Sequence, residues 1–186
     1  MKPRIEAGDG IELRVLRLRD ADCVYAAIDA NRSYLAEWLP WVNGTESVRD
    51  TLTFISSQLE KFALRQGVTY GIWADGTYAG NVSLHAIDSI HRHAEIGYWL
   101  AAAFAGRGVM TRACGALAKH AFEELRLHRL EIRAAVGNVK SRAVAERLGF
   151  VPVGVVRGAE RVGDRDLDHV VYGLSANEWN MRSART

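Results

Sequence analysis

The stretch Ala105-Gly106-Arg107-Gly108-Val109-Met110-Thr111 lies between a strand-like run, residues 94–100, and a long helix-like run. The first amides of a helix have no partner within the helix, and the helix dipole adds partial positive charge at the same place. Glycines let the backbone approach a ligand closely because no side chain stands in the way. A strand, a glycine-bearing loop and a helix in this order therefore predict a site for a phosphorylated ligand.

Length and composition limit the class of protein. The chain has 186 residues, 48% of them hydrophobic and 25% charged, with a formal net charge of +2. We expect one domain over residues 1–186, because no repeat, low-complexity tract or linker divides the chain. The charge is too small to indicate a nucleic-acid partner, and no apolar run approaches the roughly 20 residues of a membrane helix. Cys23 and Cys114 show no metal or redox spacing, and we expect a cytoplasmic protein.

The first half of the chain alternates between strand and helix patterns. Residues 10–17 alternate as a strand, and Asp20 precedes a helix over residues 21–28. A second helix is predicted from Ser47 to about Arg65. Two strand-like runs, 68–74 and 78–84, are joined by Asp75-Gly76, which is a strong hairpin signal. With residues 93–100 they predict an antiparallel meander.

The second half predicts a parallel crossover. The helix after the glycine loop leads to an alternating strand over residues 130–136, so strand, helix and strand follow one another across 94–136. Residues 138–148 are expected to form a short helix that Gly149 ends in the left-handed conformation. Residues 151–156 and 168–174 are predicted as the last two strands. A mixed α/β sheet covered by helices follows.

These motifs together resemble the GNAT superfamily of N-acetyltransferases. Residues 95–100 resemble its central strand, and residues 106–111 resemble its pyrophosphate loop. Residues 138–141, with Leu148-Gly149-Phe150, resemble its second cofactor motif. The segments 38–41 and 163–172 are similar to those of the RimL-like subgroup, whose members modify protein N-termini, including those of ribosomal proteins. The resemblance covers nearly the whole chain.

The resemblance implies a fold and an activity. The fold is a mostly antiparallel seven-stranded sheet with a parallel, splayed pair at the cofactor site, flanked by about four helices. The activity is transfer of an acetyl group from acetyl-CoA to a primary amine by direct attack, with no metal. A protein N-terminal α-amine, as on a ribosomal protein, is the expected acceptor. A small amine (an antibiotic, polyamine or amino acid) and a CoA-binding sensor without turnover are the alternatives, and a homodimer is left open because dimers are common in the family.

One departure from the family pattern concerns the loop. The general loop is Gln/Arg-x-x-Gly-x-Gly/Ala, whereas this chain has Ala105 at the first position and Met110 at the last. Methionine there is compatible with the RimL-like subgroup. Ala105 removes a polar side chain near the phosphates. We expect weaker CoA binding but not a loss of function, because backbone amides still bind the phosphates.

The resemblance also implies the donor site. The loop amides would bind the pyrophosphate, and the strand over 96–100 would bend away from its neighbour, with Gly97 easing a bulge. An amide of Trp99 or Leu100 would donate to the thioester oxygen. Arg107 is a candidate ligand of a CoA phosphate, as is Arg142 or Lys140, and a solvated side chain is the alternative for each. The predicted CoA-binding residues are Tyr98, Trp99, Leu100, Ala105, Gly106, Arg107, Gly108, Val109, Met110, Thr111, Asn138, Ser141 and Arg142.

Ser141, Glu160 and Glu95 are the candidate catalytic residues. Asn138 and Ser141 are three residues apart, so both can face the cofactor across one helical turn. By resemblance Asn138 bonds the pantetheine arm and Ser141 acts at the leaving sulfur; the alternative is that Asn138 only caps the helix. Glu160 is the expected base, with Glu95 as the other candidate, and either could instead be a solvated or ion-paired carboxylate.

The histidines and two of the tryptophans are not assigned to the predicted site. His85, His91 and His93 lack a recognisable set of metal ligands, so surface or core histidines are the expectation. Trp38 and Trp41 are expected to pack in the core, with lining of the acceptor pocket as the alternative.

Overall fold

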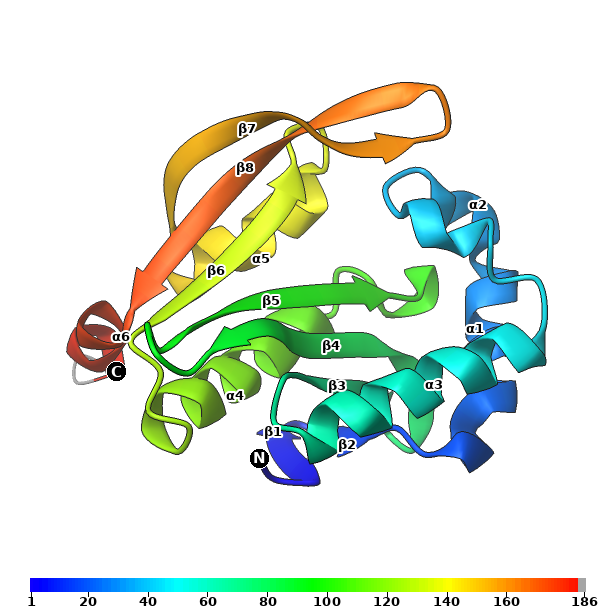
Figure 1. Cartoon of the computed structure of the whole chain (residues 1–186), viewed down its shortest axis with the longest axis horizontal. Coiled ribbons are helices and arrows are strands. Elements are labelled where there is room, and N and C mark those ends of the chain that lie inside the picture. The colour runs from blue at the N-terminus through cyan, green and yellow to red at the C-terminus, as the bar shows by residue number, and fades with distance from the viewer. Residues whose placement is uncertain (184–186) are drawn as a thin grey trace.

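The protein is built around one mixed sheet. The structure is a computed structural model that describes residues 1–183. Its sheet has the order β1-β2-β3-β4-β5-β6-β8-β7, and every neighbouring pair is antiparallel except β5–β6 (Figure 1). The strands are β1 (Arg4–Gly8), β2 (Ile11–Val15), β3 (Val68–Ala74), β4 (Thr77–Asp88), β5 (His93–Leu100), β6 (Arg129–Ala135), β7 (Val151–Val162) and β8 (Arg165–Ser175).

Helices cover both faces of the sheet. The α-helices are α1 (Ala21–Ala30), α2 (Arg32–Ala36), α3 (Val48–Ala63), α4 (Val109–Glu123), α5 (Val139–Leu148) and α6 (Ala176–Ser183), and the short 3₁₀ helices are η1 (Leu18–Asp20), η2 (Pro40–Val42) and η3 (Ala102–Phe104). On one face α4 buries Leu117 completely among the β-strand side chains. On the other face Val24 of α1 and Ile55 of α3 enclose Trp99 in a second cluster. The two clusters leave β5 covered on both sides.

Several local predictions are confirmed. The fold class is the predicted mixed sheet with one parallel pair, and β3, β4 and β5 form the predicted meander. Asp75 and Gly76 both have positive φ, 49° and 77°, as a two-residue hairpin turn requires. Ser47 and Asp50 form a capping box at the start of α3. Gly149 ends α5 with φ of 86°.

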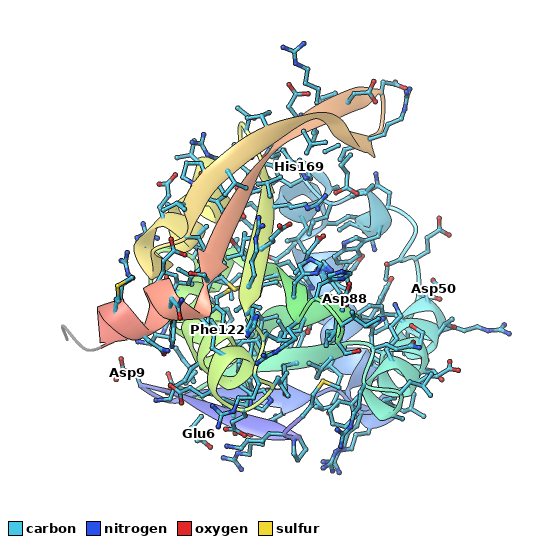
Figure 2. All side chains as sticks on the ribbon, turned by 60° about the vertical axis from the view of Figure 1, so that its left-hand side comes forward. Glu6, Asp9, Asp50, Asp88, Phe122 and His169 are labelled. Carbon is cyan, nitrogen blue, oxygen red and sulfur yellow. The ribbon has the colours of Figure 1, made fainter. Side chains whose placement is uncertain are left out.

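The structure adds elements to those expected from the sequence. The sheet has eight strands where seven were expected, and residues 1–183 contain six α-helices where about four were expected. The additional strand, β1, is an edge strand whose side chains are only exposed or half-buried, so its sequence lacks a strong apolar alternation. Trp179 of the additional helix α6 packs on Phe122 of α4, with 5.8 Å between ring centroids; Figure 2 labels Phe122.

The hairpin β7–β8 is longer than predicted and bends over the molecule. Between Val156, which pairs with His169, and Glu160, which pairs with Leu167, the register shifts by extra residues on β7. Gly158 in this bulge has φ of 55°, and its amide donates to the Asp168 carboxylate at 2.8 Å. A bulge bends a strand and increases its twist. The tip of the hairpin therefore reaches toward α2, as Figure 1 shows.

The parallel pair separates part-way along its length. β5 and β6 are paired only from His93 and Arg129 to Ile96 and Ile132. Beyond these residues the two strands diverge, and the opening faces α2 (Figure 1). The predicted splay is thus present. Within residues 1–183, none of the helices is both long and apolar enough to cross a bilayer.

Candidate active site

A cavity of about 740 Å³ lies where β5 and β6 separate. One side of it is formed by the end of β5, the glycine loop and the starts of α4 and α5. Its other side comes from α2, the end of β6 and the β7–β8 hairpin. The predicted residues that line it are Tyr98, Trp99, Leu100, Ala105, Gly106, Gly108, Val109, Met110, Thr111, Asn138, Ser141 and Glu160.

The glycine loop presents the amino end of α4 to this cavity. Gly106 and Gly108 have φ of 76° and 75°, which favours glycine at both positions. A Cβ at position 108 would lie 2.5 Å from Nη1 of Arg112. Arg112 donates to the Arg107 carbonyl at 3.2 Å and pairs with Asp9 at 2.7 Å. The loop is therefore fastened to the β1–β2 turn, and the first amides of α4 are left for an anion.

The backbone of β5 identifies which amides face the gap. The amide of Ala101 donates to the Ala79 carbonyl at 2.8 Å, and the β4–β5 register continues without a shift from there to Glu95. Because amide directions alternate along an antiparallel strand, the amide of Trp99 also points at β4. The amides of Tyr98 and Leu100 point the other way, toward the space that β6 has left. Of the two predicted donors, the geometry keeps Leu100.

Gly97 has a different role from the one predicted. The unbroken pairing from Gly80–Leu100 to His85–Glu95 means that β5 has no bulge at Gly97, so that prediction is wrong. A Cβ at this position would instead lie 2.7 Å from Nε2 of His85, a separation that real Cβ atoms do not adopt. The His85 ring of β4 thus lies against the backbone of β5 at Gly97, and a larger residue there would require the ring to move.

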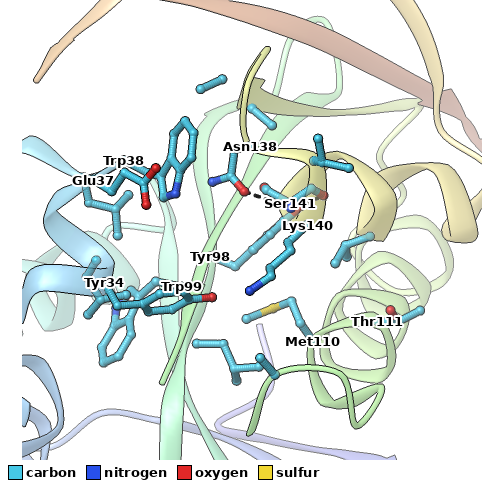
Figure 3. A pocket seen from close by; sticks show the side chains of 18 of the residues that line it. Tyr34, Glu37, Trp38, Tyr98, Trp99, Met110, Thr111, Asn138, Lys140 and Ser141 are labelled. Atoms are coloured by element: carbon cyan, nitrogen blue, oxygen red, sulfur yellow. Dashed lines mark hydrogen bonds between the residues drawn. The ribbon is translucent and has the colours of Figure 1, made fainter. Parts of the chain in front are cut away.

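Two hydroxyl groups meet beside the end of β5. Tyr98 Oη donates to the Ser141 carbonyl at 2.9 Å, and Ser141 Oγ donates to Tyr98 Oη at 3.2 Å. Asn138 caps α5, because its side-chain oxygen accepts from the Ser141 amide at 3.1 Å. Burial raises the pKa of Tyr98, so its hydroxyl stays protonated at neutral pH. Figure 3 shows Tyr98, Asn138 and Ser141 together in the cavity.

The opposite wall carries aromatic rings and carboxylates. Tyr34, Glu37 and Trp38 enter from α2 and the residues after it (Figure 3). Glu160 lines the cavity from β7 and His169 from β8; Figure 2 shows His169 beneath the arch of the hairpin. In residues 1–183 the Glu160 carboxylate has neither a hydrogen bond nor an ion pair, although the backbone of Glu160 pairs with Leu167. The wall therefore holds two carboxylates toward an incoming cation.

Three predicted residues do not line the cavity. Glu95 lies in the part of β5 that is still paired with β6, and its carboxylate forms an ion pair with Arg133 at 3.1 Å. Arg142 donates to Tyr172 Oη at 2.9 Å and to a backbone carbonyl, so it holds α5 on the sheet. The guanidinium of Arg107 lies over the Phe104 ring, 5.5 Å from its centre. The phosphate role predicted for the two arginines has no support in these positions.

The cavity also contains cations that the predicted set omitted. Lys140 and Arg147 line it, and Lys140 Nζ stands 5.5 Å from the centre of the Tyr34 ring. With Val144, which also lines the cavity, they lie four and three residues apart along α5. This spacing places them on one helix face. The face could have been found from the sequence once Asn138 had fixed the start of α5.

A comparison with protein families identifies the family of the chain. The sequence matches the acetyltransferase (GNAT) domain over residues 11–151. The chain belongs to the GNAT acetyltransferase family.

Individual relatives agree with this membership. The chain of this GNAT protein is 40% identical over 176 residues to "Putative ribosomal N-acetyltransferase YdaF" of Bacillus subtilis (strain 168), over 94% of this chain and 96% of that protein. It is 27% identical to the ribosomal-protein-serine acetyltransferase of Escherichia coli (strain K12), over 92% and 96%. A RimL structure, a ribosomal L7/L12 alpha-N-protein acetyltransferase with coenzyme A, superposes with a TM-score of 0.91 at 26% identity, over 94% and 99%.

The GNAT protein is an acetyl-CoA-dependent N-acetyltransferase, and the predicted enzyme class and acyl donor are confirmed. Its own residues fit this donor. The cavity combines the first amides of α4 with the cations Lys140 and Arg147, which suit phosphates, and an apolar floor that includes Met110 and Val144. Among residues 1–183, no three histidine, cysteine or acidic side chains gather as metal ligands would.

Asn138 offers a test that separates capping from donor binding. We expect Asn138→Ala to lower the free energy of unfolding by about 1 kcal/mol, because the cap of α5 is lost. Asn138→Asp keeps an acceptor oxygen and should leave stability nearly unchanged. Both variants remove the amide N–H, so both should bind acetyl-CoA about fivefold more weakly, the value of one hydrogen bond. Thermal melts and calorimetric titration measure the two effects, and wild-type affinity in Asn138→Asp would leave Asn138 with the capping role alone.

Proposed function

We propose that this enzyme acetylates the N-terminal α-amine of a protein by direct attack of the amine on the thioester. The observation that carries the proposal is the single cavity in which the α4 amides and the carboxylates of Glu37 and Glu160 face each other across the β5–β6 splay. The names of the relatives supply the acceptor, because they refer to ribosomal proteins and to an α-N acceptor. A ribosomal acceptor would place the reaction in the cytoplasm.

The donor side orients the thioester. The amides that begin α4 bind the pyrophosphate, with Lys140 and Arg147 close enough to the cavity to add charge. Asn138 donates its side-chain N–H to the pantetheine arm. The Leu100 amide faces the gap and donates to the thioester oxygen as negative charge develops there. Removing one donor of this kind typically raises a barrier by about 2.7–4 kcal/mol.

Ser141 is the proposed proton donor to the leaving sulfur. The Tyr98 proton is already committed to the Ser141 carbonyl at 2.9 Å, whereas Ser141 Oγ donates to another hydroxyl and can turn to a new acceptor. Tyr98 therefore orients the serine. A thiol has a pKa of about 8.5, so the thiolate of CoA needs little assistance to leave. A hydroxyl donor is sufficient for this step.

Glu160 is the proposed base. The Glu95 carboxylate forms an ion pair with Arg133, whereas the Glu160 carboxylate lines the cavity and has no hydrogen-bond or ion-pair partner in residues 1–183. A protein α-amine has a pKa of about 7.7–8.0 and a lysine amine about 10.4. The α-amine is thus partly neutral at pH 8, and a carboxylate acting directly or through water can remove its proton. A carboxylate is therefore a strong enough base for the proposed α-amine acceptor.

An acceptor screen tests the function. We expect CoA release from acetyl-CoA with peptides that have a free N-terminus, and none with the same peptides acetylated at the N-terminus and carrying an internal lysine. Spermidine, an aminoglycoside and free amino acids form the small-amine arm. Release with small amines alone would replace the protein acceptor by a small one. If calorimetry detects acetyl-CoA binding but no acceptor leads to CoA release, the protein would be a CoA-binding sensor.

The base has its own signature. Glu160→Gln should lower kcat/KM by about 10²-fold for an acceptor of high amine pKa, and less for an α-amine, since removing a general base costs about 10²–10⁴-fold. Rates are measured at pH 8 for one peptide and one small amine. Glu37→Gln is the matched control, because it removes the other carboxylate of the same wall. Equal effects of the two substitutions on both acceptors would contradict a base role for Glu160.

The two hydroxyls are separated by paired variants. Ser141→Ala should lower kcat about tenfold or more, with little change in the Kd of acetyl-CoA, because the proton donor is lost. Tyr98→Phe should lower kcat less, because the serine hydroxyl remains and loses only its orienting partner. Presteady-state thiol release and calorimetry give the two constants. A larger kcat loss in Tyr98→Phe than in Ser141→Ala would transfer the acid role to Tyr98.

A further inference from the structure

Trp38 bridges the two sides of the cavity. It follows α2, yet the six-membered ring of its indole rests on Gly137, in the loop between β6 and α5. A Cβ at position 137 would lie 3.3 Å from Cη2 and 3.5 Å from Cζ3 of Trp38. Only a glycine at this position lets the ring edge come this close to the loop without displacement. The indole thus spans the splay from the acceptor side to the donor side.

The contact lies at the reacting end of the cavity. Gly137 directly precedes Asn138, which caps α5 and binds the Ser141 amide, and the Ser141 hydroxyl meets Tyr98. Figure 3 shows the Trp38 ring beside Asn138 and above Tyr98. The part of the cavity that the indole covers therefore contains the groups proposed to act on the thioester, not those that bind the phosphates.

A second contact fixes the backbone that carries the indole. The guanidinium of Arg165, at the tip of the β7–β8 hairpin, donates to the carbonyl of Glu37 at 2.7 Å. This hairpin also carries Glu160, five residues before Arg165 in the sequence. Residue 37 is thus held by one wall of the cavity, and the ring of residue 38 contacts the other. The backbone next to the indole is thus tied to the hairpin that carries the proposed base, and the ring contacts the residue before Asn138.

We propose that Trp38 closes the acyl end of the cavity, where it excludes water from the thioester and positions the acceptor amine. The proposal rests on acetyl transfer at this site. An indole is large, flat and stiff, so it forms an apolar wall at a small cost in side-chain entropy. Its hold on Gly137 is van der Waals contact alone, so an acceptor displaces the ring without breaking a hydrogen bond.

Water and the amine compete for the same carbon. In transfer, the amine nitrogen bonds to the acetyl carbon, the carbon–sulfur bond breaks, and the amine proton leaves through the base. In hydrolysis, a water oxygen takes the place of the nitrogen, and the products are acetate and CoA thiol. Both reactions release the same thiol, so the ratio of release without acceptor to release with acceptor reports how well the site excludes water. A purely structural role for Trp38 would not change this ratio.

The test uses the full-length enzyme and acetyl-CoA, first alone and then with the best acceptor of the screen. We expect Trp38→Ala to raise acceptor-free thiol release about tenfold and the KM of the acceptor about tenfold, with an unchanged Kd for acetyl-CoA. Trp38→Phe keeps a ring in the same place and should restore most of the wild-type ratio. Unchanged hydrolysis and acceptor KM in Trp38→Ala, or a loss of acetyl-CoA affinity instead, would overturn the proposal.

Trp41 supplies the matched control. It is in the same segment, 40% exposed, packs on Trp99 with 6.2 Å between ring centroids, and does not line the cavity. Trp41→Ala should lower stability without changing the ratio of hydrolysis to transfer. An enzyme that binds no acetyl-CoA would refute the activity itself, whereas wild-type binding with an unaltered ratio in Trp38→Ala would refute only the role of Trp38.

A change on the other side of the contact tests the geometry. Gly137 does not have positive φ, so Gly137→Ala adds a methyl group without backbone strain. The methyl group would displace the indole by a few tenths of an ångström and should raise the acceptor KM about twofold. In the Trp38→Ala background the same substitution should have no effect, because the ring is gone. Equal effects in both backgrounds would overturn the contact as the cause.

Discussion

The end of backbone pairing between β5 and β6 is the feature on which the active site depends. After Ile96 and Ile132 the strands diverge, and the amides of Tyr98 and Leu100 lose the neighbour that a regular sheet would give them. Unpaired backbone groups away from water cost free energy unless another group satisfies them. A ligand with an extended, amide-containing arm is such a group. In the proposed mechanism the arm of the cofactor therefore continues the sheet beyond the β5–β6 pairing, with the thioester beside the Leu100 amide.

The divergence of the strands is maintained by side chains that join β5 to α5. Tyr98 reaches from the strand to the first turn of the helix, where Ser141 both accepts its proton and donates to its oxygen. Asn138 ties the same turn down by capping it. Arg142, one residue further, bonds Tyr172 and so holds α5 on the β6–β8 side of the gap. Helix capping, helix docking and placement of the proposed acid are therefore one set of interactions, which is why a single residue such as Asn138 can serve both folding and binding.

Local signals in the sequence predicted what depends on neighbouring residues. The Asp75-Gly76 turn, the capping box at Ser47 and the left-handed cap at Gly149 follow from the chemistry of two to four adjacent residues. The glycine loop before α4 belongs to the same class. Predictions that depended on residues distant in the sequence were not met. Gly97 lies against His85 of another strand and forms no bulge. Glu95 is ion-paired with Arg133 of β6, and Arg142 donates a hydrogen bond to Tyr172, thirty residues away. The strand β1 was not predicted, because an edge strand needs little apolar alternation.

This division has a consequence for specificity in the family fold. In the proposed mechanism the donor side consists mainly of two contiguous motifs, residues 105–111 and 138–141, most of whose residues line the cavity. The acceptor side is assembled from α2, the β6–α5 loop and the β7–β8 hairpin, which meet through the Trp38–Gly137 and Arg165–Glu37 contacts. Trp38 and Arg165 belong to the segments 38–41 and 163–172, and the two contacts join residues about 100 and 128 positions apart in the sequence. Changes in the length or bend of the hairpin would move Glu160 and the backbone of residue 37 together, while leaving the α4 amides untouched. On this proposal, acceptor preference can change while the donor residues stay the same, because the two sides of the cavity rest on different interactions.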